Sequence, residues 1–171
     1  MTNSYIKSGF ARLENDHYPT VDARCMISLL AAYPDIPAPS LDPFCSATES
    51  TKLAPAISGN LRDVKGRFQS VITNPPYKRG LVDKLMKSVI NAVKDGDIQV
   101  AAALMRINWD CAKQRSSYWK WPFACSLRLQ YRPYWSEEPA TASPIHSYQW
   151  LIWDRRHKVE PVIRYHDGIS L

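Results

Sequence analysis

Hydrophobic residues recur at helical spacing in two stretches of the chain. Between residues 20 and 32 the apolar side chains fall three or four positions apart, and the prolines of residues 33–39 end the helix that they predict. Between residues 81 and 93 the apolar side chains share one face, and the turn at residues 94–97 closes this second helix. The sequence therefore predicts two amphipathic helices.

Short and nearly continuous apolar runs predict buried strands between and after these helices. The runs cover residues 40–45, 68–73, 98–105, 127–131 and 148–153, and a last run at 161–165 predicts an edge strand. Strand, helix and strand follow one another across residues 68–105, which indicates a parallel α/β sheet. Residues 1–16 are polar and expected to be loose, and proline and glycine interrupt residues 50–66.

The composition is that of one globular domain. The 171 residues are 45% hydrophobic, which is enough for a packed core, and we expect a single domain over residues 1–171. No apolar run reaches the length of a membrane span, and the start of the chain lacks the apolar core of a secretory signal. We therefore expect a soluble, intracellular protein.

Cysteine and histidine spacing gives no sign of a metal site. The chain has no C-x-x-C pair, and its histidines are scattered, so we expect no bound metal and no disulfide framework. Buried thiols are the favoured interpretation of the four cysteines, which are Cys25, Cys45, Cys111 and Cys125.

Positive charge and aromatic residues coincide in the last third of the chain. The net charge is +6, and residues 106–132 interleave basic residues with tryptophan, tyrosine and phenylalanine. This pattern suits a phosphate backbone with exposed bases, but it also suits a solvated cationic face over core aromatics. The candidate phosphate contacts are Arg106, Lys113, Arg115 and Lys120.

The motif with a chemical interpretation is Asn74-Pro75-Pro76-Tyr77, which follows a predicted strand and precedes a predicted helix. An exocyclic amine is a poor nucleophile until its N–H groups are held by acceptors. Asn74 offers an amide oxygen, Pro75 offers a carbonyl, and the Tyr77 ring offers a flat face for an extruded base. The alternative is an ordinary proline-rich turn.

With its flanking elements, this motif resembles the signature loop of S-adenosylmethionine-dependent amino-group methyltransferases, in particular DNA adenine-N6 methyltransferases. The resemblance implies a Rossmann-like sheet, S-adenosylmethionine as cofactor, DNA as partner and residues 74–77 as the catalytic loop. Residues 17–20 and 41–46 resemble the elements that hold the cofactor in that family. The cofactor-binding residues implied are Tyr18, Pro19, Thr20, Asp42, Pro43, Phe44, Cys45 and Asp63.

The chain departs from the family pattern in two places. Residues 45–49 lack the glycines usual in the cofactor loop, although Glu49 is available for the ribose hydroxyls. The segment between this loop and Asn74 is also short for a βαβ unit, which takes roughly thirty residues. We therefore expect a sheet shortened between its first strand and the Asn74 strand, with the second strand missing or rudimentary.

Three functions follow from these observations. The first is adenine-N6 methylation of DNA in the cytoplasm of a prokaryotic cell or phage-infected host. The second keeps the reaction but uses an RNA base or a protein glutamine, since both present a planar amino group. The third is a non-catalytic methyltransferase fold that binds nucleic acid, which the missing glycines favour. The recognition sequence and the oligomeric state stay open.

Overall fold

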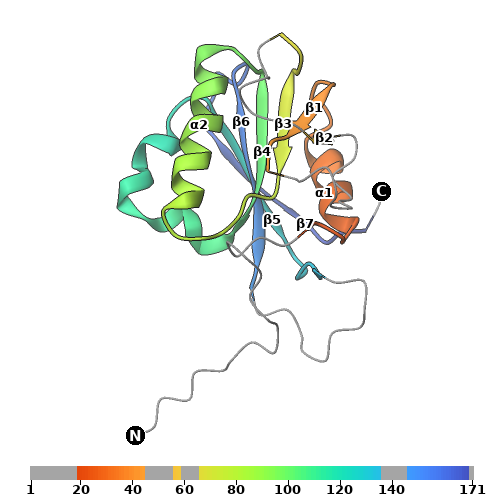
Figure 1. Cartoon of the computed structure of the whole chain (residues 1–171). Helices are drawn as coiled ribbons and strands as arrows, with labels where there is room; N and C mark the ends of the chain where they lie inside the picture. Colours follow the sequence, from red (N-terminus) through yellow and green to blue (C-terminus); the bar gives the residue numbers. More distant parts are fainter. Residues whose placement is uncertain (1–18, 45–55, 59–65, 136–145, 170–171) are drawn as a thin grey trace, which may run out of the picture.

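The computed structural model describes residues 19–44, 56–58, 66–135 and 146–169 (Figure 1). In chain order the elements are α1 (Arg24–Ala32), β1 (Ser40–Asp42), β2 (Ala56–Ser58), β3 (Ser70–Thr73), α2 (Leu81–Asp95), β4 (Val100–Arg106), the 3-10 helices η3 (Ile107–Cys111) and η4 (Lys113–Trp119), β5 (Phe123–Leu129), β6 (Tyr148–Asp154) and β7 (Val162–His166). The described strands form one seven-stranded sheet in the order β2-β1-β3-β4-β6-β5-β7. The chain is thus an α/β protein, as the sequence predicts.

The sheet is mixed rather than parallel throughout. β1 pairs in parallel with both β2 and β3, and β3 pairs in parallel with β4. β6 lies between β4 and β5 and is antiparallel to both, so the expectation of a parallel sheet is wrong for this strand. The apolar run of β6 indicates a buried strand but carries no information on its direction.

The edge of the sheet formed by β2 is short. β2 has only three residues and pairs with β1 at one edge of the sheet, so a second strand is present in a rudimentary form. β7 forms the opposite edge beside β5, which confirms the predicted edge strand. Its residues Val162, Ile163 and Tyr165 are exposed.

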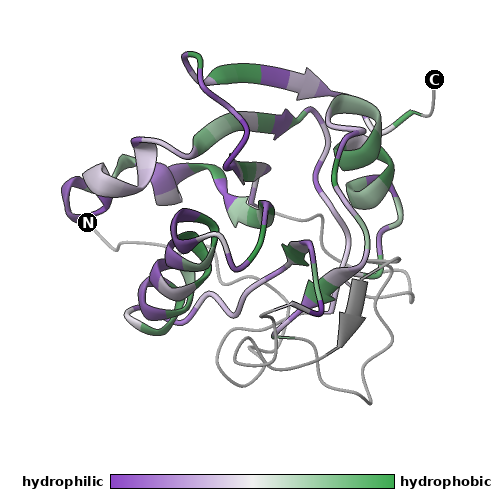
Figure 2. Ribbon diagram, turned by 90° about the horizontal axis from the view of Figure 1, so that it is seen from above, coloured by the Kyte–Doolittle hydropathy of each residue, from purple (hydrophilic) through white to green (hydrophobic). Residues whose placement is uncertain are grey.

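One helix covers each face of the sheet. Alternate residues of β4 point to opposite faces, so Ala101 and Ala103 join the core beneath α2, while Val100 and Ala102 join the core beneath α1. The hydrophobic side of α2 is turned toward the sheet and its hydrophilic side is turned away (Figure 2). The left-handed Gly96, with φ of 85°, ends α2 and turns the chain into β4.

The cysteines only partly follow the prediction. Cys25 and Cys125 are buried, and burial raises the pKa of the first thiol to about 12 and of the second to about 11. Cys111 is exposed at the end of η3, so the expectation of a buried thiol is wrong there. Cys45 lies outside the described residues.

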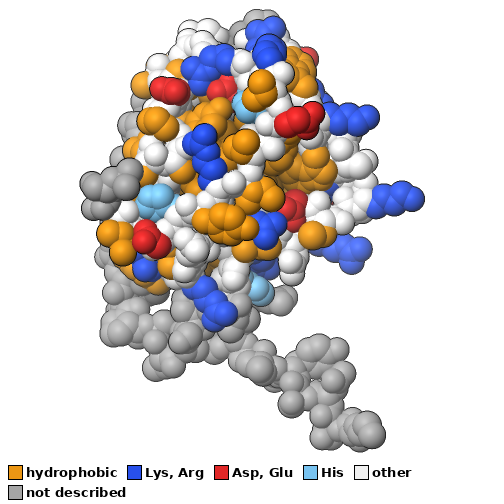
Figure 3. All heavy atoms as spheres, turned by 180° about the vertical axis from the view of Figure 1, so that it is seen from behind, with side chains coloured by type: hydrophobic (Ala, Val, Ile, Leu, Met, Phe, Trp, Pro, Cys, Tyr) orange, Lys and Arg blue, Asp and Glu red, His pale blue; other side chains and the backbone are white. Residues whose placement is uncertain are grey.

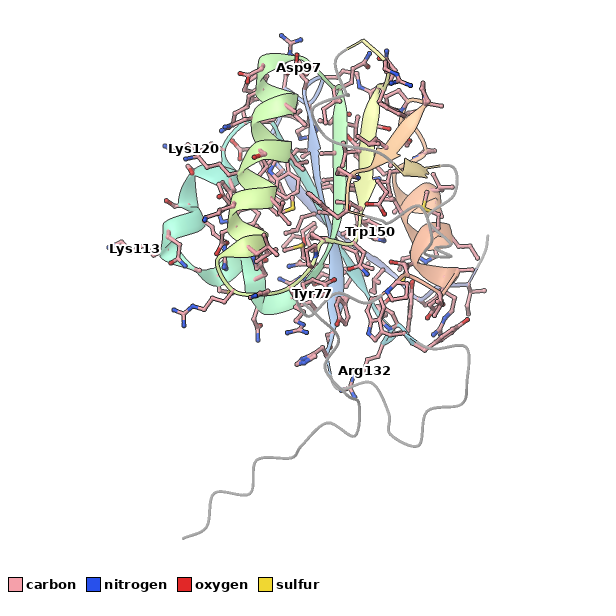
Figure 4. The ribbon with its side chains drawn as sticks, in the orientation of Figure 1. Tyr77, Asp97, Lys113, Lys120, Arg132 and Trp150 are labelled. Atoms are coloured by element: carbon pink, nitrogen blue, oxygen red, sulfur yellow. The ribbon has the colours of Figure 1, made fainter. Side chains whose placement is uncertain are left out.

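Trp150 joins α1 to the sheet and supplies a test of this packing (Figure 4). Its ring is fully buried, and its Nε1 donates a hydrogen bond of 2.9 Å to the carbonyl oxygen of Cys25. Trp150→Ala should lower the free energy of unfolding by about 3–5 kcal/mol, because it leaves a large cavity. Urea denaturation measures this change.

Trp121 is the matched control for that substitution. It is 46% exposed, with the Lys158 Nζ 4.6 Å from its ring centroid. Trp121→Ala should lower the free energy of unfolding by less than about 1 kcal/mol. Equal losses in the two variants would contradict the assignment of Trp150 to the core.

Candidate active site

The Asn74 loop lies where the strand order of the sheet reverses. From β1 the chain first adds β2 on one side and then β3 on the other, with Leu41 level with Val71 in the pairing of β1 and β3. Asp42 ends β1 and Asn74 follows β3, so both lie at the carboxyl ends of adjacent parallel strands. Ligands of open α/β sheets bind at this kind of switch point. The expected adjacency of the two strands is therefore confirmed.

A buried hydrogen bond links the two strand ends. The Thr73 hydroxyl donates to Oδ1 of Asp42 at 2.7 Å, and the backbone N–H of Phe44 donates to the same oxygen at 3.2 Å. Asp42 is 4% exposed and Thr73 is fully buried. The carboxylate thus orients the turn after β1 and ties it to the residue that precedes Asn74.

Tyr77 folds back onto the loop that contains it. Its hydroxyl lies 2.6 Å from Oδ1 of Asn74 and 2.8 Å from the carbonyl oxygen of Leu104, and it donates toward both. Asn74 is 3% exposed, and Pro75 and Pro76 are buried as well. The single hydroxyl proton is shared between these two oxygens, and the contact ties the amide of Asn74 to the ring of Tyr77. The sequence assigns a role to the ring of Tyr77 and misses this role of the hydroxyl.

Other flat groups surround the Tyr77 ring. The Arg106 guanidinium carbon lies 4.8 Å from the ring centroid, and the Tyr148 ring lies 5.9 Å away at an angle of 55°. Trp135 packs edge-on against Tyr148 with centroids 4.9 Å apart. The loop therefore opens onto a cluster of aromatic rings and one cation.

The cofactor-binding residues predicted from the sequence are only partly described. Thr20 is 2% exposed, and its hydroxyl has no hydrogen-bond partner among the described residues. Pro19, Pro43 and Phe44 are partly buried, and Phe44 packs against the core beneath α2. Tyr18, Cys45, Glu49 and Asp63 lie outside the described residues.

The aromatic residues of the basic stretch belong mainly to the core. The rings of Trp109, Tyr118, Trp119 and Phe123 contact one another, and Trp119 stacks on Trp153 of β6 with centroids 6.2 Å apart. The interpretation as core aromatics beneath a charged surface is therefore the better one for these rings.

Arg115 and the lysines of the same stretch have different surroundings. Arg115 is 12% exposed, forms an ion pair of 2.6 Å with Asp83 of α2 and lies over the Trp109 ring. These internal contacts give no support to its predicted phosphate contact. Lys113 and Lys120 are exposed, and they project from the flank of the molecule away from Tyr77 (Figure 4).

Other basic residues lie closer to the loop. Lys78 and Arg79 follow Tyr77 directly and are exposed, and Arg132 lies at the same edge of the molecule as Tyr77 (Figure 4). The view from behind shows basic side chains dispersed among hydrophobic ones rather than gathered in one stripe (Figure 3). Lys78 and Arg79 could have been identified from the sequence, because they directly follow the Asn74 loop.

The described ranges hold neither a membrane-spanning helix nor a metal-binding cluster. No helix there combines the length and apolar character needed to cross a bilayer. No group of three or more His, Cys, Asp or Glu side chains there is arranged to hold a metal ion.

The bond between Thr73 and Asp42 can be tested by stability measurements. Thr73→Val keeps the branched shape but removes the donor, so the buried carboxylate is left with one partner fewer. The free energy of unfolding should fall by about 1–3 kcal/mol. Thr73→Ser keeps the hydroxyl and should be clearly less destabilised. A valine variant as stable as the original protein in urea denaturation would show that the bond does not hold the strand ends together.

No protein-family model matches the chain, and no curated protein or solved structure matches it either. The chemistry open to the site depends on its own contacts. The two that matter most are the bond between Thr73 and Asp42 and the bond between Tyr77 and Asn74.

Proposed function

We propose that the chain transfers a methyl group from S-adenosylmethionine to the N6 amino group of adenine in DNA. One observation carries the proposal: the Asn74 loop and the Asp42 turn lie side by side at the switch point, joined through Thr73. This puts the acceptor loop beside the turn expected to hold the cofactor. The resemblance of the loop to amino-group methyltransferases supports the same reaction.

The loop has the acceptors that the reaction needs. S-adenosylmethionine supplies an electrophilic methyl group on a sulfonium centre. The amide oxygen of Asn74 has two lone pairs, so it can accept one amine N–H while it keeps the bond from Tyr77. The carbonyl of Pro75 accepts the second N–H. Both bonds draw the nitrogen lone pair out of the ring, and they strengthen as the nitrogen becomes tetrahedral.

Neither acceptor removes the proton. Amide oxygens are very weak bases, so Asn74 and Pro75 hold the two N–H groups without taking a proton from them. The bond from nitrogen to the methyl carbon forms as the bond from sulfur to that carbon breaks, and the amine then releases one proton to solvent. On this scheme the loop works by orientation and hydrogen bonding alone.

Two described groups fit the cofactor. The buried Thr20 hydroxyl has no partner among the described residues, and a ligand would satisfy it. The Asp42 carboxylate holds the turn after β1 in place through the N–H of Phe44. On the family resemblance this set is completed by Tyr18, Pro19, Pro43, Phe44, Cys45 and Asp63.

The choice of DNA depends on charge. The chain carries a net charge of +6, and Lys78 and Arg79 are exposed directly after the loop. Phosphate groups on either side of an extruded nucleotide would meet these cations. An RNA base is the nearest alternative, and the charge disfavours a protein glutamine.

A non-catalytic nucleic-acid-binding protein is the second candidate. The observation that favours it is the absence of glycine from residues 45–49, where a cofactor needs close approach to the backbone. Calorimetry with S-adenosylmethionine separates the two candidates, because only an enzyme of the proposed type binds the cofactor.

Asn74→Ala should lower the turnover number by roughly 10²–10³, the range seen when one hydrogen bond to a reacting centre is removed. Cofactor affinity should hardly change, because Asn74 faces the acceptor. Radiolabelled methyl transfer to DNA measures turnover, and Asn91→Ala, an exposed asparagine on α2, is the matched control. Equal turnover in the Asn74 variant and the original protein would remove the loop from the mechanism.

Salt dependence tests the DNA partner. Lys78→Ala combined with Arg79→Ala should reduce the slope of log K against log salt for duplex DNA by about 1.8, because each phosphate that a cation neutralises adds about 0.9 to that slope. The slope should change less in the flank pair Lys113→Ala and Lys120→Ala.

A control pair of substitutions removes the same two positive charges at a different place on the molecule. Arg67 precedes β3, and Arg155 follows β6 beside the amino end of β4, so both exposed residues lie on the edge opposite to the Asn74 loop. Their replacement by alanine should leave the slope unchanged. If the original protein does not bind DNA even at low salt, DNA is not the acceptor.

A further inference from the structure

The Tyr77 ring is held rigidly at the acceptor site. Its hydroxyl donates toward two oxygens from different parts of the sheet, Oδ1 of Asn74 after β3 and the carbonyl of Leu104 in β4. A ring tied in this way keeps its plane when a ligand arrives. A base that stacked on this ring would thus meet a ring that two contacts already hold in place.

That surface is occupied by another flat group. The guanidinium carbon of Arg106 lies 4.8 Å from the centroid of the Tyr77 ring, which is the distance of a cation–π contact. A guanidinium is planar and stacks on aromatic rings, as a nucleobase does. An extruded base that stacked on this face of the ring would therefore compete with Arg106.

The backbone of Arg106 need not move for this occupancy to change. Arg106 is the last residue of β4, and its position is fixed by pairing with Tyr148 of β6. Its side chain is partly exposed although its Nε is buried, and a long side chain on a fixed strand end can change rotamer without moving the backbone. Lys78 and Arg79 are exposed directly after Tyr77, where phosphates would approach on the proposed function.

We propose that Arg106 gates the acceptor site: its guanidinium covers the Tyr77 ring in the free protein, and a purine base displaces it and stacks there. The displaced guanidinium then pairs with a phosphate beside the extruded nucleotide. The gate rests on the proposed function, because it assumes that the acceptor is a nucleobase. In this scheme the base enters and the phosphate is bound in the same step, because both depend on the same movement of Arg106.

The proposal predicts two effects of one substitution: tighter binding of free adenosine and a smaller salt dependence of DNA binding. In Arg106→Ala the ring is uncovered, so free adenosine should bind about two- to five-fold more tightly, the equivalent of one exposed cation–π contact. Single-stranded DNA should have one phosphate fewer paired with a cation, so the slope of log K against log salt should fall by about 0.7. Calorimetry with adenosine and fluorescence anisotropy with a labelled oligonucleotide measure the two effects on the full chain.

Three further variants make the result specific. Arg106→Lys keeps the charge but not the flat group, so it should bind adenosine more tightly and retain the salt slope. In Arg106→Ala combined with Tyr77→Ala, the gain in adenosine affinity should disappear, which separates this ring from any other adenosine site. Arg67→Ala, at the opposite edge, should leave both measurements unchanged.

Each contrary outcome points to a different error. If the original protein binds adenosine and Arg106→Ala binds it equally or less tightly, the gate is wrong while the proposed acceptor stands. If adenosine binding tightens and the salt slope stays the same, the phosphate step is wrong. If neither protein binds adenosine or DNA, the nucleic-acid acceptor itself is wrong, and the gate fails with it.

Discussion

A seam of buried polar side chains holds β1 against β3, and the position of the candidate site depends on it. At the amino end the Ser70 hydroxyl donates to the carbonyl of Pro37 at 2.7 Å and accepts from Ser40 at 2.7 Å. At the carboxyl end Thr73 donates to Asp42. The four side chains of this seam are buried and would lose these partners in a shift of one residue, so the seam fixes the register of two very short strands.

The register in turn determines what meets at the switch point. With β1 and β3 level, the residue after Thr73 leaves the sheet directly beside the Asp42 turn, so Asn74 cannot lie elsewhere. The two prolines that follow restrict the backbone, and Tyr77 returns to bond with Asn74. A short polar seam, the Tyr77 hydroxyl and the Leu104 carbonyl of β4 thus position a buried amide oxygen.

The sequence predicts the elements with local signals and misses the contacts that form over long separations. The amphipathic pattern of α2 is visible because its period is local, and the edge strand β7 is visible because it is a bounded apolar run. The antiparallel direction of β6 has no local signal. The pairing of Arg115 with Asp83 and the stacking of Trp119 on Trp153 also join residues about thirty or more positions apart, so charge and aromaticity alone misplace them.

The proposed function gives a physical reason for the burial of the site. On that proposal the amine of adenine would become nucleophilic through hydrogen bonds to Asn74 and Pro75, and water would compete for the same oxygens. In a site of low polarity these bonds are stronger and need no reorganisation during the reaction. Asn74 is 3% exposed, and the groups packed around Tyr77 keep the approach covered. A guanidinium that leaves only when a base arrives would keep the Tyr77 ring covered in both states, since guanidinium and base would occupy the same surface in turn.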